Sequence, residues 1–251
     1  MIQGLEHIVS ELPSISLVDL TAVEFDSRVD TKFVFHQDKL VEYLEKVSAD
    51  LVVLEVHGKR IFNYQNLYCD DAGFHFFQRH HSGFGNRSKV RVRKYSDEGP
   101  FYFEVKNKTN KGKTVKYRIP LMQFQDFETP ETAYLTKEYT GFKFEELPNR
   151  TEIEYQRITL SNKGLTEKLT LDFGMKTQNQ ESKFEFKNLV IAEVKQIHYS
   201  SRSAFIRTLK EMKIYKTSFS KYCSSVALLN SNLKQNRFKK IIANVKNIAN
   251  A

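Results

Sequence analysis

The chain of 251 residues contains little cysteine, proline or glycine, and each shortage excludes a class of structure. Its two cysteines, Cys69 and Cys223, lie far apart and belong to no CxxC or Cys/His motif. We therefore expect buried free thiols, with neither a disulfide framework nor a structural zinc site. Five prolines and ten glycines leave no low-complexity linker, and no internal repeat is found. These absences favour a single domain over residues 1–251.

Long apolar runs and a secretory signal are also missing. The longest apolar stretches, such as Leu51–Leu54 and Leu189–Ala192, are far shorter than the roughly 20 residues that a membrane helix needs. The first 16 residues carry Glu6, His7 and Glu11 and lack the basic-then-apolar order of a signal peptide. We therefore expect a cytoplasmic protein that does not insert into a membrane.

Basic and aromatic residues, in contrast, are abundant. The 39 Lys and Arg exceed the 30 Asp and Glu, so the formal net charge is +9 and the pI is about 9.3. Such an excess indicates a polyanionic partner. The 20 Phe and 12 Tyr supply enough apolar surface for a core, which excludes disorder for most of the chain.

The hydrophobic pattern changes along the chain from strands to helices. One helix is predicted early, over 39–46, where Asp38 can act as its cap, and the stretch 80–85 is expected to be a mobile loop. The last part has helical spacing over 205–215, 219–229 and 233–248. The predicted strands are 28–35, 51–56, 61–68, 89–95, 101–106, 114–119, 153–159, 169–173 and 189–195. This order predicts an α+β fold, with an antiparallel sheet or barrel followed by C-terminal helices.

Charged residues occupy alternate positions within these strands and therefore share one face of each. The basic members are Arg28, Lys32, Lys89, Arg91, Arg93, Lys106, Lys116, Arg118, Arg157, Lys168 and Lys195, and the acidic members are Asp30, Glu104, Asp172 and Glu193. In any single strand, such a face would ordinarily lie in water. Over the whole set, however, Lys and Arg dominate and crowd together. We therefore expect a closed barrel, in which the charged faces of the strands line the interior and the apolar faces lie outside, under helices. Segment 153–159 fits this barrel less well.

A basic interior of this kind is suited to phosphate chains. One guanidinium group can donate two parallel hydrogen bonds to phosphate oxygens, and lysines act as point charges. The few carboxylates would hold a divalent metal ion through oxygen ligands. Since the sequence contains no GxxxxGK[ST] loop, kinase glycine-rich loop or HExxH motif, the corresponding enzyme classes have little support.

An ordered series of short motifs resembles a known family. The motifs are RVDTK (28–32), NLYCD (66–70), HHSG (80–83), RSKVRVR (87–93), EVK (104–106), KYR (116–118), YQR (155–157), EKLTLD (167–172), EVK (193–195) and FSKY (219–222). Together they resemble the catalytic domain of the vacuolar transporter chaperone (VTC) polyphosphate polymerases, in the CYTH or triphosphate tunnel metalloenzyme superfamily. The resemblance covers about residues 28–222.

This resemblance implies a tunnel of eight antiparallel strands, with a barrel core over about 24–200 and C-terminal helices over about 203–249. It further implies synthesis of polyphosphate from ATP, with release of ADP. Glu193 would hold Mn²⁺ or Mg²⁺, and Lys221 would close one tunnel mouth. The expected catalytic residues are Lys32, Arg91, Arg93, Lys106, Arg157 and Lys195, and the expected phosphate-binding residues are Arg28, Lys89, Lys116, Arg118, Lys168 and Lys221.

Two departures from the family pattern refine this expectation. Hydrolases of the superfamily begin with ExExK, whereas Arg28 and Asp30 stand at the two glutamate positions here, which favours the polymerase branch. Lys168 replaces an expected arginine, which keeps the charge and loses the two-point geometry. Regulatory and transmembrane segments of the fungal proteins are not found in this sequence, so it resembles a free-standing, bacterial-type form.

Other interpretations remain open at this stage. The protein could be a triphosphatase of the same fold, or a module that binds polyphosphate or nucleotide without turnover. A specific nucleic-acid partner is not expected, because the basic residues alternate within strands and form no terminal arm. His80 and His81 could touch phosphate near the tunnel entrance, but adjacent histidines point in different directions, so at least one of them is expected at the surface. Asp172 and Glu104 could join a metal site or pair with nearby cations.

Overall fold

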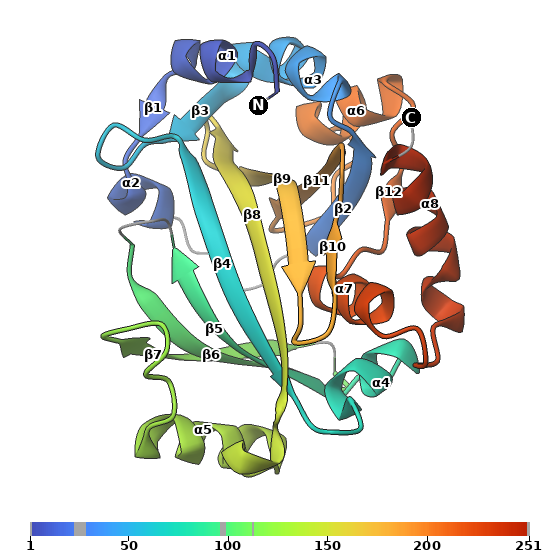
Figure 1. Ribbon diagram of the computed structural model, residues 1–251. Helices are drawn as coiled ribbons and strands as arrows, with labels where there is room; N and C mark the ends of the chain where they lie inside the picture. Colours follow the sequence, from blue (N-terminus) through green and yellow to red (C-terminus); the bar gives the residue numbers. More distant parts are fainter. Residues whose placement is uncertain (1, 23–28, 96–98, 112, 250–251) are drawn as a thin grey trace.

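The computed structural model describes residues 2–22, 29–95, 99–111 and 113–249, in which twelve strands form one curved sheet with helices around it (Figure 1). The strands are β1 (Ser14–Ile15), β2 (Val29–His36), β3 (Leu51–Leu54), β4 (Ile61–Asp70), β5 (Arg87–Tyr95), β6 (Phe101–Lys108), β7 (Thr114–Leu121), β8 (Asn149–Asn162), β9 (Glu167–Gln178), β10 (Lys183–Glu185), β11 (Leu189–Gln196) and β12 (Lys216–Thr217). The helices are α1 (Leu5–Glu11), α2 (Leu17–Ala22), α3 (Lys39–Val47), α4 (His75–His81), α5 (Pro130–Thr140), α6 (Ala204–Glu211), α7 (Lys221–Leu229) and α8 (Lys239–Ala249). Short 3₁₀ turns lie at η1 (Ser48–Asp50), η2 (Phe144–Glu146) and η3 (Asn236–Phe238).

The sheet is open, so the prediction of a closed eight-stranded barrel is wrong. Its main path runs β12-β2-β11-β9-β8-β4-β5-β6-β7, and within the described residues the end strands β12 and β7 do not pair with each other. All pairings are antiparallel except that of β1 with β3. The edge strand β7 carries exposed Lys116 and Arg118, and Pro120 has no backbone N–H to donate. Charged side chains and proline are typical of edges that are protected from further pairing.

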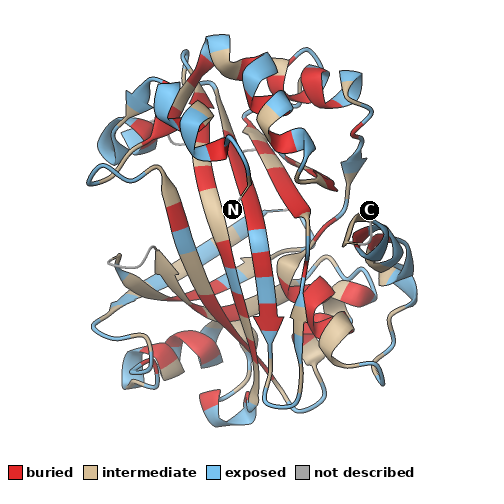
Figure 2. Ribbon diagram, turned by 45° about the horizontal axis from the view of Figure 1, so that its top comes forward, coloured by how far each residue is buried: buried red, intermediate tan, exposed pale blue. Residues whose placement is uncertain are grey.

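The outer face of the sheet is apolar and lies under helices, as the alternation predicts. On one half, Val190, Ala192 and Val194 of β11 pack in a core with residues of α1, α3 and α6. On the other half, Val90 and Val92 of β5 pack with Phe103 and with residues of α5 and η2. Figure 2 shows the resulting alternation of buried and more exposed positions along the strands.

The inner face is partly filled by the C-terminal helices. Ile191 and Val34, which alternate with the outer-facing residues of β11 and β2, contribute to a core that also contains Tyr222 and Val226 of α7 and Val245 of α8. This core covers one end of the inner face. Charged side chains remain on the rest of that face.

Two helices differ from the sequence-based expectation. The segment predicted as a mobile loop over 80–85 begins inside α4, because Asp70 accepts hydrogen bonds from the backbone N–H groups of Phe76 and Phe77 at 2.9 and 3.0 Å. These bonds cap the helix. Helix α5, for which no prediction was made, begins with a reciprocal Thr129–Thr132 capping box and a proline in its first turn.

No helix within the described ranges is long and apolar enough to cross a lipid bilayer.

The packing predicts which changes destabilise the fold. Phe103 is 0% exposed, and its replacement in Phe103→Ala should lower the free energy of unfolding by about 3–5 kcal/mol, because it leaves a cavity between β6 and the 3₁₀ turn η2. Met122 is 91% exposed, so the control Met122→Ala should change it by less than about 0.5 kcal/mol. Urea unfolding followed by circular dichroism measures both; equal effects would contradict the core described above.

Candidate functional site

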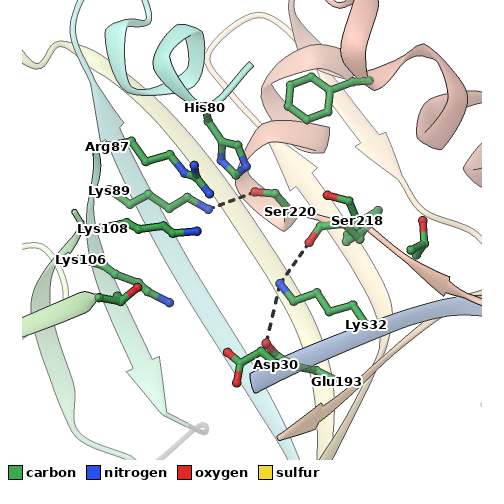
Figure 3. Close-up of a pocket in the computed structure, with 14 residues that line it drawn as sticks. Asp30, Lys32, His80, Arg87, Lys89, Lys106, Lys108, Glu193, Ser218 and Ser220 are labelled. Carbon is green, nitrogen blue, oxygen red and sulfur yellow. Dashed lines mark hydrogen bonds and ion pairs between the residues drawn. The ribbon is translucent and has the colours of Figure 1, made fainter. Parts of the chain in front are cut away.

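A cavity of about 450 Å³ lies on the inner face of the curved sheet, between strands β2 and β11 on one side and strands β5 and β6 on the other (Figure 3). Its charged lining comes from strands far apart on the strand path: Asp30 and Lys32 from β2, Glu193 from β11, Arg87 and Lys89 from β5, and Lys106 and Lys108 from β6. His80 of α4 and the segment Thr217–Ser220 before α7 complete most of the wall. The volume falls within the range of about 300–1,000 Å³ that is usual for small-molecule sites.

Cations face one another directly across two neighbouring strands of this cavity. In the β5–β6 register, Lys89 stands opposite Lys106 and Arg87 stands opposite Lys108. Like charges in such pairs destabilise a sheet. Although the Lys106 side chain is exposed, partial desolvation in the cavity wall, followed by the charges of Lys89 and Arg91, lowers its pKa to about 8. An anion between the two strands would relieve this repulsion.

The N-terminal end of α7 adds polar groups to the same wall. The Ser220 hydroxyl caps the helix by accepting the backbone N–H of Cys223 at 3.3 Å, and it also accepts a hydrogen bond from Lys89 Nζ at 3.1 Å. Lys32 Nζ donates to the carbonyl oxygen of Phe219 at 3.1 Å. The partial positive charge of a helix N-terminus also favours anions.

Two carboxylates lie at the opposite side of the cavity, beside lysines. Lys195 Nζ lies 2.8 Å from Glu193 Oε2 and 3.6 Å from Asp30 Oδ2, and Lys32 Nζ lies 3.8 Å from Glu193 Oε1. Burial alone would raise the pKa of Glu193, but Lys32 and Lys195 outweigh it and hold that pKa well below its usual range. Glu193 is therefore ionised near neutral pH.

These two carboxylates fit a metal ion that shares its ligands with a substrate. No group of three or more His, Cys, Asp or Glu that could hold a metal by itself is found in the described part of the chain. Mg²⁺, however, is commonly held by one or two carboxylates together with phosphate oxygens and water. Asp30 and Glu193 are the carboxylates among the described residues that line this cavity.

Two of the predicted arginines, Arg91 and Arg157, lie beside the cavity lining in ion pairs with buried carboxylates. Arg91 contacts Glu104 at 2.6 Å, and Arg157 binds Asp172 through two hydrogen bonds of 2.5 and 2.7 Å. Glu104 is also bound by Lys116 at 2.5 Å, and Asp172 is bound by Lys221. Glu104 and Asp172 thus pair with cations, the second of the two roles left open by the sequence.

Tyrosine side chains lie next to the guanidinium groups of Arg93 and Arg91. Arg93 donates to Asn66 Oδ1 at 2.7 Å and lies over the rings of Tyr64 and Tyr95, at 5.7 and 5.4 Å from their centroids. Tyr68 accepts a hydrogen bond from Arg91 at 2.8 Å. Burial would raise the pKa of Tyr68, but Arg91, Lys89 and Arg93 lower it to about 7. This layer continues the basic inner face beyond the cavity.

The structure places the predicted residues in different surroundings. Lys32, Lys89, Lys106 and Glu193 line the cavity; Arg91, Arg157, Lys116, Lys195 and Lys221 form ion pairs next to it, and Arg93 lies among tyrosines. Arg118 is exposed over the ring of Tyr102, and Lys168 stands opposite Lys195 between β9 and β11. Arg28 lies outside the described residues.

Several cavity residues were missed by the sequence analysis. Arg87 and Lys108 extend the same alternation by one step, two positions before Lys89 and two after Lys106, so strand parity could have found them. Ser220 belongs to a quoted motif but was given no role. The expectation that His80 or His81 lies at the surface is wrong, because His80 lines the cavity and His81 is buried, accepting the backbone N–H of Arg237.

Comparisons with known proteins identify one matching family and several structures of similar fold. A family model described as the VTC domain matches residues 27–230, which is most of the chain. Of the solved structures, the Hippeastrum protein HpAC1, described as a proposed adenylyl cyclase with a dominant triphosphatase activity, has a TM-score of 0.51 at 12% identity, over 81% of this chain and 97% of that chain. This likeness shows the fold alone.

Two further structures are more distant. A Vibrio parahaemolyticus protein, described as a proposed adenylate cyclase, has a TM-score of 0.42 at 11% identity over 77% of this chain and 95% of that chain. The PH1819 protein of Pyrococcus horikoshii has a TM-score of 0.40 at 12% identity over 80% and 98%. No curated protein matches the sequence significantly.

The buried ion pairs predict a loss of stability in acid. Burial would raise the pKa of Glu104, but Arg91, Arg93 and Lys116 lower it to about 2, so its contribution is complete above its unfolded pKa of about 4.5 and is lost as the pH falls to about 2. In Glu104→Gln, the decrease in unfolding free energy between pH 5 and pH 2 should be smaller than in wild type by about 3 kcal/mol. Urea titrations across this range test it, with exposed Glu154→Gln as control; identical pH slopes for all three proteins would contradict the pairing.

Proposed function

Because the chain belongs to the VTC domain family, we propose that it is an ATP-dependent polyphosphate polymerase. The terminal phosphate of a growing chain attacks the γ-phosphorus of ATP; the bond from that phosphorus to the β,γ-bridging oxygen breaks, and ADP leaves. The substrates are ATP and phosphate or polyphosphate, and the expected compartment is the cytoplasm.

The observation that carries this proposal is the presence of two pairs of opposed cations, Lys89 with Lys106 and Arg87 with Lys108, in the cavity at the N-terminal end of α7. Four positive charges on adjacent strands demand a ligand with several closely spaced negative charges. A chain of phosphates meets this demand, since each phosphate carries charge and accepts hydrogen bonds. A single carboxylate or an apolar ligand does not.

The reaction requires mainly positioning and neutralisation of charge. The terminal phosphate of the acceptor is already ionised near neutral pH, so no strong general base is needed. Lys32, Lys89 and Lys106 hold consecutive phosphates by charge, and the Ser220 hydroxyl orients one of them. A divalent ion, Mg²⁺ or Mn²⁺, held by Glu193 and Asp30 would supply further neutralisation of the phosphate oxygens.

The remaining predicted cations are assigned to the rest of the phosphate path. Arg91, Arg93 and Arg157 bind nucleotide phosphates; Arg93 is suited to this because no ion pair to a carboxylate is recorded for it among the described residues. Arg91 and Arg157 are fixed in orientation by their carboxylate partners. Lys195 holds Glu193 and the growing chain, with Lys116, Arg118, Lys168, Lys221 and Arg28 as further phosphate-binding residues.

The reaction products test the proposal. Purified protein incubated with ATP labelled at the γ-phosphate and Mg²⁺ or Mn²⁺ should yield ADP and labelled chains that an exopolyphosphatase degrades. Release of labelled inorganic phosphate without chains would replace the proposal by a triphosphatase, the activity described for HpAC1. Salt-sensitive polyphosphate binding without turnover would indicate a binding module, and stronger binding of RNA than of polyphosphate would overturn the choice of partner.

Removal of a cavity charge should weaken substrate binding. Lys89→Met removes an ammonium group that stands opposite Lys106 and bonds Ser220, so the Kd for tripolyphosphate should rise tenfold or more, on the order of the loss of one charged hydrogen bond. Isothermal titration calorimetry at constant ionic strength measures the change. The matched control Lys187→Met removes an exposed lysine between β10 and β11 and should leave Kd unchanged; a similar loss in both variants would indicate only a general charge effect.

The lowered pKa of Lys106 predicts a basic limit to binding. Because this pKa is about 8, the side chain is charged below that pH and neutral above it, so affinity for tripolyphosphate should fall as the pH rises through about 8. Lys106→Arg keeps its charge and should retain affinity to higher pH. The Kd of both proteins is measured from pH 6.5 to 9.5. Ionisation of the ligand affects both proteins equally, so it does not contribute to the difference between them. Superimposable pH profiles would disprove this role for Lys106.

A further inference from the structure

One pair of side chains at the cavity has no part in the reaction described above. The imidazole Nδ1 of His80, at the end of α4, lies 3.0 Å from the Sγ of Cys223, in the first turn of α7. His80 is half-buried and lines the cavity, whereas Cys223 is fully buried. Figure 3 shows the His80 ring between the side chains of Arg87 and Ser220.

The direction of this hydrogen bond depends on the ring tautomer of His80. Burial raises the pKa of the Cys223 thiol, so the sulfur keeps its proton and has an S–H to donate. When this S–H donates to Nδ1, the proton of a neutral ring resides on Nε2.

The surroundings keep this imidazole neutral. Burial, then the charges of Lys89, Arg87 and Lys32, lower the pKa of His80 to about 3. The groups that face it are Arg87 and Lys89 of β5, Lys32 of β2, Lys108 of β6 and Cys223 of α7. Near pH 7 the ring is therefore uncharged, with one N–H and no further positive charge to add to a crowded set of cations.

We propose that His80 is a phosphate-binding residue whose Nε2–H donates a hydrogen bond to a phosphate oxygen in the cavity, and that Cys223 is the positioning residue that holds this tautomer. The proposal rests on the proposed function and deepens it. Among the described residues, Nε2 has no recorded hydrogen-bond partner. Lysines attract phosphate from any direction, whereas this donor is directional and fixes where along the chain a phosphate stops.

A matched pair of substitutions tests the donor. The amide nitrogen of glutamine can occupy the place of Nε2, whereas that of asparagine reaches only to the place of Nδ1. We expect His80→Gln to bind tripolyphosphate with a Kd within about threefold of wild type, and His80→Asn to bind about tenfold more weakly at pH 7 and fixed ionic strength. Exposed His198→Asn should have no effect. Equal affinity in wild type and His80→Asn would overturn the proposal.

The tautomer is measured directly in the unmodified protein. Two-bond ¹H–¹⁵N correlation spectra identify the protonated ring nitrogen, and the His80 signals are assigned from their loss in His80→Gln. Wild type should show the Nε2–H form, Cys223→Ser should retain it through the hydroxyl donor, and Cys223→Ala should show a mixture. A wild-type ring protonated on Nδ1 would overturn the proposal whatever the binding measurements show.

The outcomes separate this inference from the function on which it rests. If wild type does not bind tripolyphosphate, the proposed function fails and this inference fails with it. If wild type binds tripolyphosphate and forms polyphosphate, while His80→Asn binds equally well, only the role of His80 is lost.

Discussion

Repulsion between like charges on one face of the sheet is the constraint to which the rest of the structure responds. Lys89 faces Lys106, Arg87 faces Lys108, and Lys195 faces Lys168 across neighbouring strands. Such pairs oppose the association of the strands that carry them. The sheet therefore needs stabilisation from elsewhere, and the charged face needs partners of opposite sign.

The stabilisation comes from the other face of the same strands. Val90, Val92 and Phe103 lie on the opposite face of the two strands that carry the opposed cations and are fully buried in a core with residues of α5 and η2. On the other half of the sheet, Val190 and Ala192 are fully buried in the core with α1, α3 and α6. Apolar burial of this kind stabilises without placing any group in the cavity. Stability and binding thus reside on opposite faces of each strand.

The partners of opposite sign are distributed unevenly. Glu104 and Asp172 are fully buried, and each binds two cations, so the arginines beside the cavity are largely compensated. In the cavity itself, Asp30 and Glu193 lie by the lysines of β2 and β11 and also act on Lys106 of β6, whereas Lys89 of β5 bonds the neutral Ser220. Cations therefore outnumber carboxylates in the cavity lining, where a phosphate chain is proposed to bind. The uncharged side chains of His80 in α4 and Ser220 before α7 line the same wall of the cavity.

Much of this could be predicted from the sequence, because strand alternation is a local property. The predicted strand over 89–95 and the inward direction of Lys89, Arg91 and Arg93 follow from their alternation with Val90 and Val92. Extension of the same rule reaches Arg87, where β5 begins, and Lys108. Helix α4 was not predicted, since its cap Asp70 lies at the end of the preceding strand. The contact of His80 with Cys223 could not be predicted either, because 143 positions separate the two residues in the chain.

The sequence by itself determined which side chains share a face, the order of the motifs that mark the VTC domain, and the excess of positive charge. Only the tertiary structure decided that the sheet stays open, because closure depends on whether the distant edges β7 and β12 meet, and local alternation says nothing of that pairing. It also decided which cations reach the cavity and which are held in ion pairs. That division depends on distances between strands that are remote in the chain, and such distances are set by packing.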